Sequence, residues 1–198
     1  YYDGFSNNAL WPLCHNAYIE PVFDQGDWET YKMVNYRFAL QVLDELDGRP
    51  GAVFTQDYHL ALLPRMLRDS NPDILTGQFW HVPWPNHEIF RICPWQDELL
   101  DGMLGNDMLG FHIGDHCQNF LETVAKADMG RVNFDYNLVS RKDDITLVRP
   151  FPISVDFEQI CADAQEASVE AEMQRLCAEW NLEGQVIGLG IDRIDYTK

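Results

Sequence analysis

Polar and titratable side chains follow several short apolar runs of the chain, and they supply groups that could bind or act on a polar ligand. Asp57-Tyr58-His59 follows the first run, His81 the second, His112 the third, and the stretch 192–198 a last one. In open parallel sheets, ligands bind at the carboxyl ends of the strands. These groups are therefore candidates for a cleft, although the loops of α/β proteins are polar in any case.

The sequence does not favour a metal centre or a hydrolytic serine. His112 and His116 form an i, i+4 pair beside Cys117, but Ile113 stands where a catalytic glutamate would follow the first histidine. We therefore predict no metal and no cofactor, and we expect satisfied or exposed histidines. No Gly-x-Ser-x-Gly elbow, Walker loop or Gly-x-Gly-x-x-Gly sequence is present.

The candidate residues are separated by segments that alternate between short apolar runs and helical patterns. Residues 28–47 carry apolar side chains at helical spacing, and Gly48 and Pro50 end this pattern. We predict strands at 52–55, 74–82, 107–111, 131–139 and 145–151, and further helices at 60–67, 87–92, 95–104 and 115–127. This alternation favours an α/β fold with a parallel sheet that is covered on both faces.

The C-terminal part of the chain changes character. Residues 156–180 are rich in carboxylates, and their apolar positions change phase near 165–168, so we expect two helices or one kinked helix. An acidic solvent-exposed helix pair and a binding role both remain open. Residues 185–190 are typical of a strand that opens a second α/β domain. The predicted division is a first domain at 1–152, an acidic helical segment at 153–183 and the start of a further domain at 184–198.

The charge of the chain restricts its partners. The 198 residues include 14 lysine and arginine residues against 32 aspartate and glutamate residues, a net charge of −18, while 46% of all residues are hydrophobic. This composition is that of a globular protein that repels nucleic acid and anionic membranes, so we predict neither as a partner. Because phosphorylated ligands are repelled too, any phosphate site must be a local arrangement of cations and N–H donors.

The cysteines indicate the cellular compartment of the protein, and the two chain ends indicate whether the sequence is a segment of a longer protein. Five cysteines without a tight framework indicate reduced thiols, and no apolar run reaches the ~20 residues of a membrane span. Since the sequence shows no signal peptide, we predict a cytoplasmic protein. The chain starts without an initiator methionine, and its predicted last strand has nothing to pack on, so we expect a segment of a longer protein.

Five ordered motifs, spread from the first to the last residue, resemble those of the trehalose-6-phosphate synthase family. The matches to the family's YYxGFSNxxLWPL, DYHL, FLHIPFP…EIF, DLLGF and ERLDYSKG are, in order, Tyr1–Leu13, Asp57–Leu60, Phe79–Phe90, Asp107–Phe111 and Asp192–Lys198. The resemblance therefore covers essentially the whole chain.

The resemblance implies a GT-B architecture, in which two Rossmann-like domains face each other across a cleft. This chain would supply most of the N-terminal acceptor domain and the first strand of the nucleotide-sugar domain, and alone it should be inactive. The implied glycosyltransferase moves glucose from a nucleotide-glucose, preferably UDP-glucose, to glucose 6-phosphate with retention, giving trehalose 6-phosphate. Its partners would be these small molecules, and a homo-oligomer is compatible with the resemblance.

The resemblance also assigns acceptor-side roles. Tyr2 and Trp11 would bind the acceptor's phosphate through O–H and N–H donors, with a core aromatic pair as the structural alternative. Asp57 would accept hydrogen bonds from the acceptor's hydroxyl groups and orient the attacking oxygen, and it could also cap the following helix.

On the donor side, His81 would lie against the donor glucose, with a structural turn histidine as the alternative. Arg193 and Lys198 would neutralise the nucleotide diphosphate as the leaving group gains charge. Asp57, His81 and Arg193 are thus the predicted catalytic residues. The family's proposed front-face substitution, in which the leaving phosphate helps to deprotonate the acceptor, requires no carboxylate nucleophile.

Departures from the motifs leave the reaction class intact but put the acceptor in doubt. Gln56 stands where the family often has histidine, Trp84 replaces phenylalanine, and His112 departs from the common GFQ. Glycerol 3-phosphate is therefore an alternative acceptor, which would give a glucosylglycerol-phosphate synthase. An inactive homologue that senses a sugar phosphate is a second alternative, although such a protein would be expected to lose a charged site residue.

Overall fold

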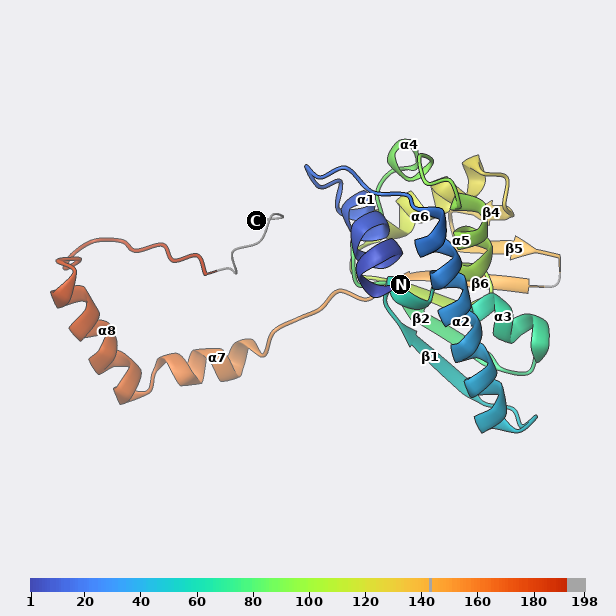
Figure 1. Ribbon diagram of the computed structural model, residues 1–198. Helices are drawn as coiled ribbons and strands as arrows, with labels where there is room; N and C mark the ends of the chain where they lie inside the picture. The colour runs from blue at the N-terminus through green and yellow to red at the C-terminus, as the bar shows by residue number, and fades with distance from the viewer. Residues whose placement is uncertain (143, 192–198) are drawn as a thin grey trace. The chain divides into compact units, whose positions relative to one another are not determined.

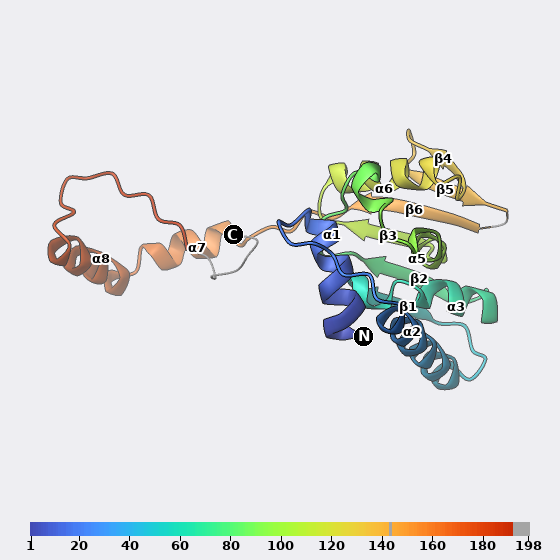
Figure 2. The ribbon, with the colours of Figure 1, turned by 45° about the horizontal axis from the view of Figure 1, so that its top comes forward.

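The sheet that carries the candidate residues has six strands in the order β1-β2-β3-β6-β5-β4. The first four of these run parallel to one another, namely β1 (Ala52–Gln56), β2 (Leu75–Phe79), β3 (Met108–Phe111) and β6 (Asp144–Pro150) (Figure 2). The last two are antiparallel to their neighbours, β5 (Leu138–Arg141) to β6 and β4 (Arg131–Asn133) to β5. The predicted α/β fold with a mainly parallel sheet is confirmed.

The computed structural model describes residues 1–142 and 144–191. They fall into two units, residues 1–152 and residues 153–191. The assignment of these units to parts of two enzyme domains stays a prediction. Of the helices described, none combines the length and the apolar character that crossing a bilayer requires.

A tight reversal replaces the single strand that we predicted at 131–139. The side chain of Asn133 accepts hydrogen bonds from the main-chain N–H groups of Asp135 (3.0 Å) and Tyr136 (3.1 Å). Asn137 then takes a left-handed conformation with φ 46°, which asparagine tolerates better than most residues. The chain folds back on itself here, so the prediction of one strand was wrong, and a hairpin extends the sheet instead.

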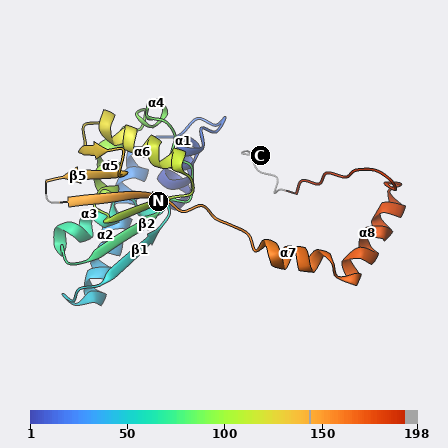
Figure 3. The ribbon, with the colours of Figure 1, turned by 180° about the vertical axis from the view of Figure 1, so that it is seen from behind.

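The helices of the first unit lie on one face of the sheet and at its edges (Figures 1 and 3). In chain order they are η1 (Tyr2–Leu10, kinked at Gly4), α1 (Trp11–His15), α2 (Gln25–Leu46), η2 (Tyr58–Leu60), α3 (Leu63–Ser70), α4 (His87–Phe90), α5 (Gln96–Met103) and α6 (Gly114–Lys126). Helix α2 begins at the N-cap Asp24, whose side chain accepts a 2.9 Å hydrogen bond from the N–H group of Asp27, and it ends at Asp47 in a left-handed conformation.

In the described residues, only one face of the sheet is covered, which corrects our prediction of two covered faces. Thr55 and Gln78 point toward the helices and are buried, whereas Phe54 and Leu75, on the opposite face, are 69% and 64% exposed. The cause is topological. The strand order β1-β2-β3-β6 advances in one direction, and because parallel crossovers are right-handed, α3, α5 and α6 all fall on the same side.

The largest side chains of the core between the sheet and the helices are aromatic. Phe5 of η1 contacts Trp28 of α2 edge-on with ring centroids 4.8 Å apart, and Trp28 stacks on Trp95 at 5.0 Å. Trp84, which replaces the family's usual phenylalanine, is buried, and its indole N–H donates a 3.2 Å hydrogen bond to Thr123. The indole of Trp84 therefore belongs to the core.

The second unit contains two helices, as one of our alternatives predicted. α7 (Phe157–Ala164) begins at Asp156, whose side chain accepts a hydrogen bond from the N–H group of Gln159, and α8 (Ala167–Glu179) follows after a short break. Residues 185–190 form no strand, so that prediction is wrong for this structure. A strand requires a hydrogen-bonded neighbour, and the described residues of this unit offer none.

Candidate functional site

Asp57 and His81 meet where two neighbouring parallel strands end. Gln56, the last residue of β1, is paired in register with Phe79, the last residue of β2. Asp57 donates its main-chain N–H to the carbonyl of Phe79 (2.7 Å), and its Oδ1 accepts from the main-chain N–H groups of His81 (3.1 Å) and Tyr58 (2.9 Å). The structure thus brings two of the predicted catalytic residues into contact, while their roles stay predictions.

The backbone of Asp57 is strained. Its φ of 66° and ψ of −173° lie in a region that is essentially restricted to glycine and that costs other residues about 1–3 kcal/mol. The surrounding structure fixes this conformation, because the buried side chain of Gln78 donates a 2.9 Å hydrogen bond to the carbonyl of Asp57 and in turn accepts one from Asn106 (3.1 Å). Asp57 is also the N-cap of η2, so the structural alternative for this residue is realised as well.

A tyrosine of α2 anchors the segment that follows Asp57. The hydroxyl group of Tyr31 donates to the carbonyl of Tyr58 (2.6 Å) and accepts from the N–H group of Ala61 (3.0 Å). Burial raises the pKa of Tyr31 far above its ordinary value, so the hydroxyl keeps its proton. In the sequence, Tyr31 is one of the apolar-face residues of the predicted helix. No local sequence pattern predicts its hydrogen bonds to η2 and the residue that follows it.

Asn35 lies one turn further along α2 and completes this anchor. Its amide oxygen accepts from the N–H groups of Leu62 and Leu63, both at 3.1 Å, and its amide nitrogen donates to the carbonyls of Tyr31 (2.9 Å) and His59 (3.3 Å). Asn35 is fully buried. Our sequence reasoning missed this residue, although a polar side chain on the buried face of a helix is the signal that could have found it.

The imidazole of His81 has a second partner in Gln56. Its Nε2 lies 2.6 Å from the amide oxygen of Gln56; with that oxygen as acceptor, Nε2 carries the proton and Nδ1 is an acceptor. The ring of Phe79 meets His81 edge-on at 4.8 Å, and His112 from the end of β3 lies 5.9 Å from His81. The departure from the family pattern at position 56 thus contacts a predicted catalytic residue directly.

The two aromatic residues predicted to bind phosphate each stack on a histidine. Tyr2, which is 56% exposed and so outside the core, lies parallel to His59 with centroids 4.9 Å apart. Trp11 is half-buried and stacks on His15 at 4.0 Å, with the Nδ1 of that histidine 2.8 Å from the carbonyl of Trp11. Exposure of Tyr2 argues against the alternative of a core aromatic pair.

The remaining predictions for the site, on the donor side and on metals, are not tested by the structure. Arg193 and Lys198 lie outside the described residues. In the part of the chain that is described, no three His, Cys, Asp or Glu side chains gather as a metal ion would require. Cys117, which we weighed as a ligand, is fully buried, and the absence of a metal or cofactor stays a prediction.

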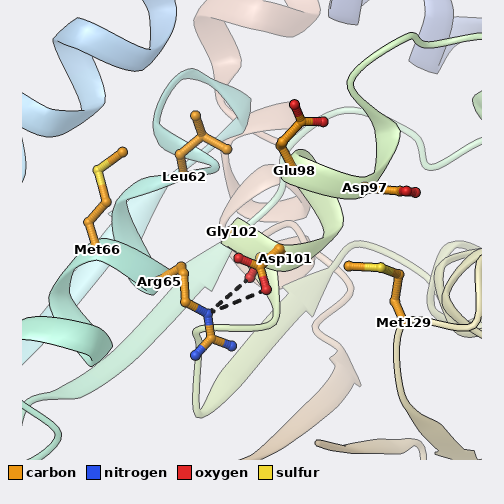
Figure 4. A pocket seen from close by; sticks show the side chains of 8 residues that line it. All are labelled: Leu62, Arg65, Met66, Asp97, Glu98, Asp101, Gly102 and Met129. Carbon is orange, nitrogen blue, oxygen red and sulfur yellow. Dashed lines mark hydrogen bonds and ion pairs between the residues drawn. The ribbon is translucent and has the colours of Figure 1, made fainter.

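A separate hollow of about 420 Å³ lies between α3 and α5 (Figure 4). Arg65 and Asp101 both line it and form an ion pair (3.7 Å), and Arg65 also pairs with Asp144 (2.9 Å). Asp144 is the first residue of β6 and lies outside the lining of this hollow. We interpret the cluster as an ionic tie between α3, α5 and β6.

Comparisons with known proteins agree with the motifs. The chain is 38% identical over 205 residues to a trehalose-6-phosphate synthase of Mycobacterium leprae, covering all of this chain but 41% of that relative. It also resembles the solved N-terminal domain of a trehalose-6-phosphate phosphatase of Candida albicans (TM-score 0.72, 31% identity, 91% of this chain and 38% of the other).

A third likeness is to a UDP-forming alpha,alpha-trehalose-phosphate synthase of Burkholderia xenovorans, solved in complex with glucose-6-phosphate. The TM-score is 0.74 at 25% identity, over 89% of this chain and 40% of the other. The predicted α/β fold of Rossmann-like type is thereby confirmed, while the division into domains stays a prediction. The family model for glycosyltransferase family 20 matches residues 1–198, and the chain therefore belongs to this family.

Proposed function

We propose that this chain is the acceptor-side part of a retaining glucosyltransferase that makes trehalose 6-phosphate from a nucleotide-glucose and glucose 6-phosphate. The observation that carries the proposal is the contact between Asp57 and His81, made at the ends of adjacent parallel strands by an aspartate with a strained backbone. Strain in a non-glycine residue is retained where function requires a fixed geometry. The membership of the chain in glycosyltransferase family 20 supports the same reaction class.

For the acceptor, we assign the phosphate to the hydroxyl of Tyr2 and the indole N–H of Trp11. Neutral donors suit a chain with a net charge of −18, because they bind an anion without relying on the overall field. The relative from Burkholderia xenovorans is a UDP-forming enzyme that binds glucose-6-phosphate. That likeness supports glucose 6-phosphate as the acceptor and UDP-glucose as the donor.

In the proposed reaction, Asp57 orients the attacking hydroxyl group. Its Oδ1 already accepts two main-chain hydrogen bonds, which fix the carboxylate, and a carboxylate retains further acceptor capacity for the hydroxyl. The bond between the anomeric carbon and the diphosphate breaks as the new carbon–oxygen bond forms on the same face, and the proton passes to the leaving phosphate. Arg193 and Lys198 would stabilise the charge that develops there.

The test is glucosyl transfer by the complete open reading frame that encodes this chain. UDP-, GDP- and ADP-glucose are offered as donors, with glucose 6-phosphate and glycerol 3-phosphate as acceptors and Asp57→Asn as the control. Formation of trehalose 6-phosphate that is lost in Asp57→Asn supports the proposal and identifies the donor. Transfer to glycerol 3-phosphate alone keeps the mechanism and replaces the acceptor.

A second candidate is a subunit or domain that binds a sugar phosphate without transferring glucose. The likeness to the N-terminal domain of a phosphatase favours it, because in that protein this fold accompanies a different named activity. Binding of glucose 6-phosphate in the absence of transfer from any donor would select this candidate. The five cysteines are free in the structure, which fits the cytoplasmic location that we propose for either function.

A further inference from the structure

The ring of His59 is packed against tyrosines at the acceptor side of the site. Tyr2 stacks on it with a centroid distance of 4.9 Å and an interplanar angle of 11°, and Tyr58 stacks on it at 4.2 Å and 25°. Tyr1 meets the same imidazole edge-on at 6.4 Å. Because Tyr2 is 56% exposed, its stack on His59 restrains a ring that solvent contact would otherwise leave free to turn.

The imidazole makes these contacts while one of its nitrogens has no partner. Nε2 of His59 is buried and forms no hydrogen bond in the described part of the chain. Burial lowers the pKa of His59, and the charge of Asp57 opposes this only in part, so the ring is neutral near pH 7. An unpaired buried nitrogen is unfavourable, so the nitrogen does not explain why a histidine lies here. The flat ring that stacks on the tyrosines does.

The backbone of His59 is held by side chains of other segments. Asn35 donates a hydrogen bond to its carbonyl oxygen (3.3 Å), and Asp57 caps the short helix in which it lies. A second link joins this helix to η1, because the hydroxyl of Tyr58 donates to Asn7 (3.0 Å). His59 therefore presents a fixed planar surface, anchored through α2, to the first residues of η1.

We propose that His59 is a positioning residue that holds the ring of Tyr2 in the orientation in which its hydroxyl meets the acceptor's phosphate group. This inference rests on the proposed function of Tyr2 in sugar-phosphate binding. His59 contributes by fixing Tyr2 before the ligand arrives, so that less side-chain freedom is lost on binding. The requirement is for a flat ring at position 59 and not for an imidazole nitrogen.

The proposal separates two substitutions. His59→Phe keeps a flat ring and removes the unpaired nitrogen, whereas His59→Ala removes the ring. In the complete enzyme, His59→Ala should raise the KM for glucose 6-phosphate about tenfold while kcat changes by less than about twofold, and His59→Phe should stay within about threefold of the wild type in both. His116→Ala is the matched control, because His116 is also half-buried with an unpaired buried nitrogen but lies on α6.

A ligand-free readout tests the positioning itself. Ring protons of Tyr2, assigned by tyrosine labelling and a Tyr2→Phe variant, should carry ring-current shifts that vanish in His59→Ala, persist in His59→Phe and persist in His116→Ala. Unchanged Tyr2 shifts in His59→Ala would overturn the proposal, whatever the enzyme's activity. Equal loss of acceptor affinity in His59→Phe and His59→Ala would also overturn it, since the imidazole itself would then be required.

The failure of the proposed function has a different signature. If the wild type neither binds nor transfers to glucose 6-phosphate, the assignment of the acceptor is wrong, while the ring-current experiment still decides whether His59 orients Tyr2. If the wild type is active and both His59 variants keep wild-type kinetics, the acceptor assignment stands and the positioning role is wrong. Circular dichroism of each variant shows whether the fold is retained.

Discussion

The hydroxyl group of Tyr31 lies 2.6 Å from the carbonyl oxygen of Tyr58, and this contact joins helix α2 to the segment directly after Asp57. The hydroxyl oxygen of Tyr31 also accepts a hydrogen bond from the N–H group of Ala61, so one side chain pairs two main-chain groups that would otherwise be buried without partners. The segment directly after Asp57 is therefore held in place by a helix residue that lies 27 positions before Tyr58 in the chain.

Tyr31→Phe should destabilise the protein and weaken the site together. Removing the hydroxyl leaves a buried donor and a buried acceptor unpaired, which costs about 2–3 kcal/mol. Urea unfolding of the 198-residue chain measures the change. Tyr36→Phe is the control, because Tyr36 is on the same helix but exposed, and it should have no measurable effect. Equal stability of the two variants would contradict the anchoring role.

Helix α2 also shows what a sequence can and cannot predict. The apolar period of residues 28–47 predicts the helix, and Gly48 and Pro50 predict its end, because these signals are local. The role of Tyr31 and Asn35 depends on partners at positions 58 to 63, and no local pattern specifies those. Likewise, the strand ends identified Asp57 and His81, but the left-handed backbone of Asp57 is imposed by Gln78 and the sheet.

The strands of the sheet were partly predictable from local sequence, but the arrangement of the sheet was not. Short apolar runs correctly predicted β1 and β3, but the expectation of two covered faces was an argument from fold class. Which face is covered follows from the strand order β1-β2-β3-β6, and strand order is a property of long-range pairing. The hairpin of β4 and β5 was missed for a different reason, since its reversal rests on the side-chain bonds of Asn133 and not on glycine or proline.

Glycine should be better tolerated than alanine at position 57. Both substitutions remove the carboxylate that accepts from Tyr58 and His81, but only alanine retains the strain at φ 66°. Asp57→Gly should therefore be more stable than Asp57→Ala by about 1–3 kcal/mol, the reverse of their order in a helix or strand interior. Denaturant unfolding of both variants decides the point, and a more stable Asp57→Ala would show that the backbone relaxes elsewhere.

The free energy of unfolding should decrease as the pH falls below about 6.5, the usual pKa of histidine. Burial lowers the pKa of His59 and of His116 below the usual value of 6.5. Below pH 6.5 the unfolded chain then binds protons that the folded chain does not, so stability rises with pH in this window and is lost as pH decreases. Unfolding free energies measured from pH 7.5 to pH 5.5 should show this slope, and it should be reduced in His59→Phe. An unchanged slope in that variant would mean that His59 titrates normally in the folded state.

The five cysteines should divide into two classes of reactivity. Burial raises the pKa of Cys93 to about 12 and of Cys117 to about 11, and it raises the pKa of Cys14 strongly as well. Because the thiolate is the reactive species and buried sulfur atoms are inaccessible, these three should not react with a thiol reagent at pH 8 until the first unit unfolds. Cys161 and Cys177, on α7 and α8, are partly exposed and should react in the native protein. Mass spectrometry after timed alkylation counts the classes. Rapid alkylation of Cys14 or Cys93 in the native chain would show that the core beneath η1 opens without global unfolding.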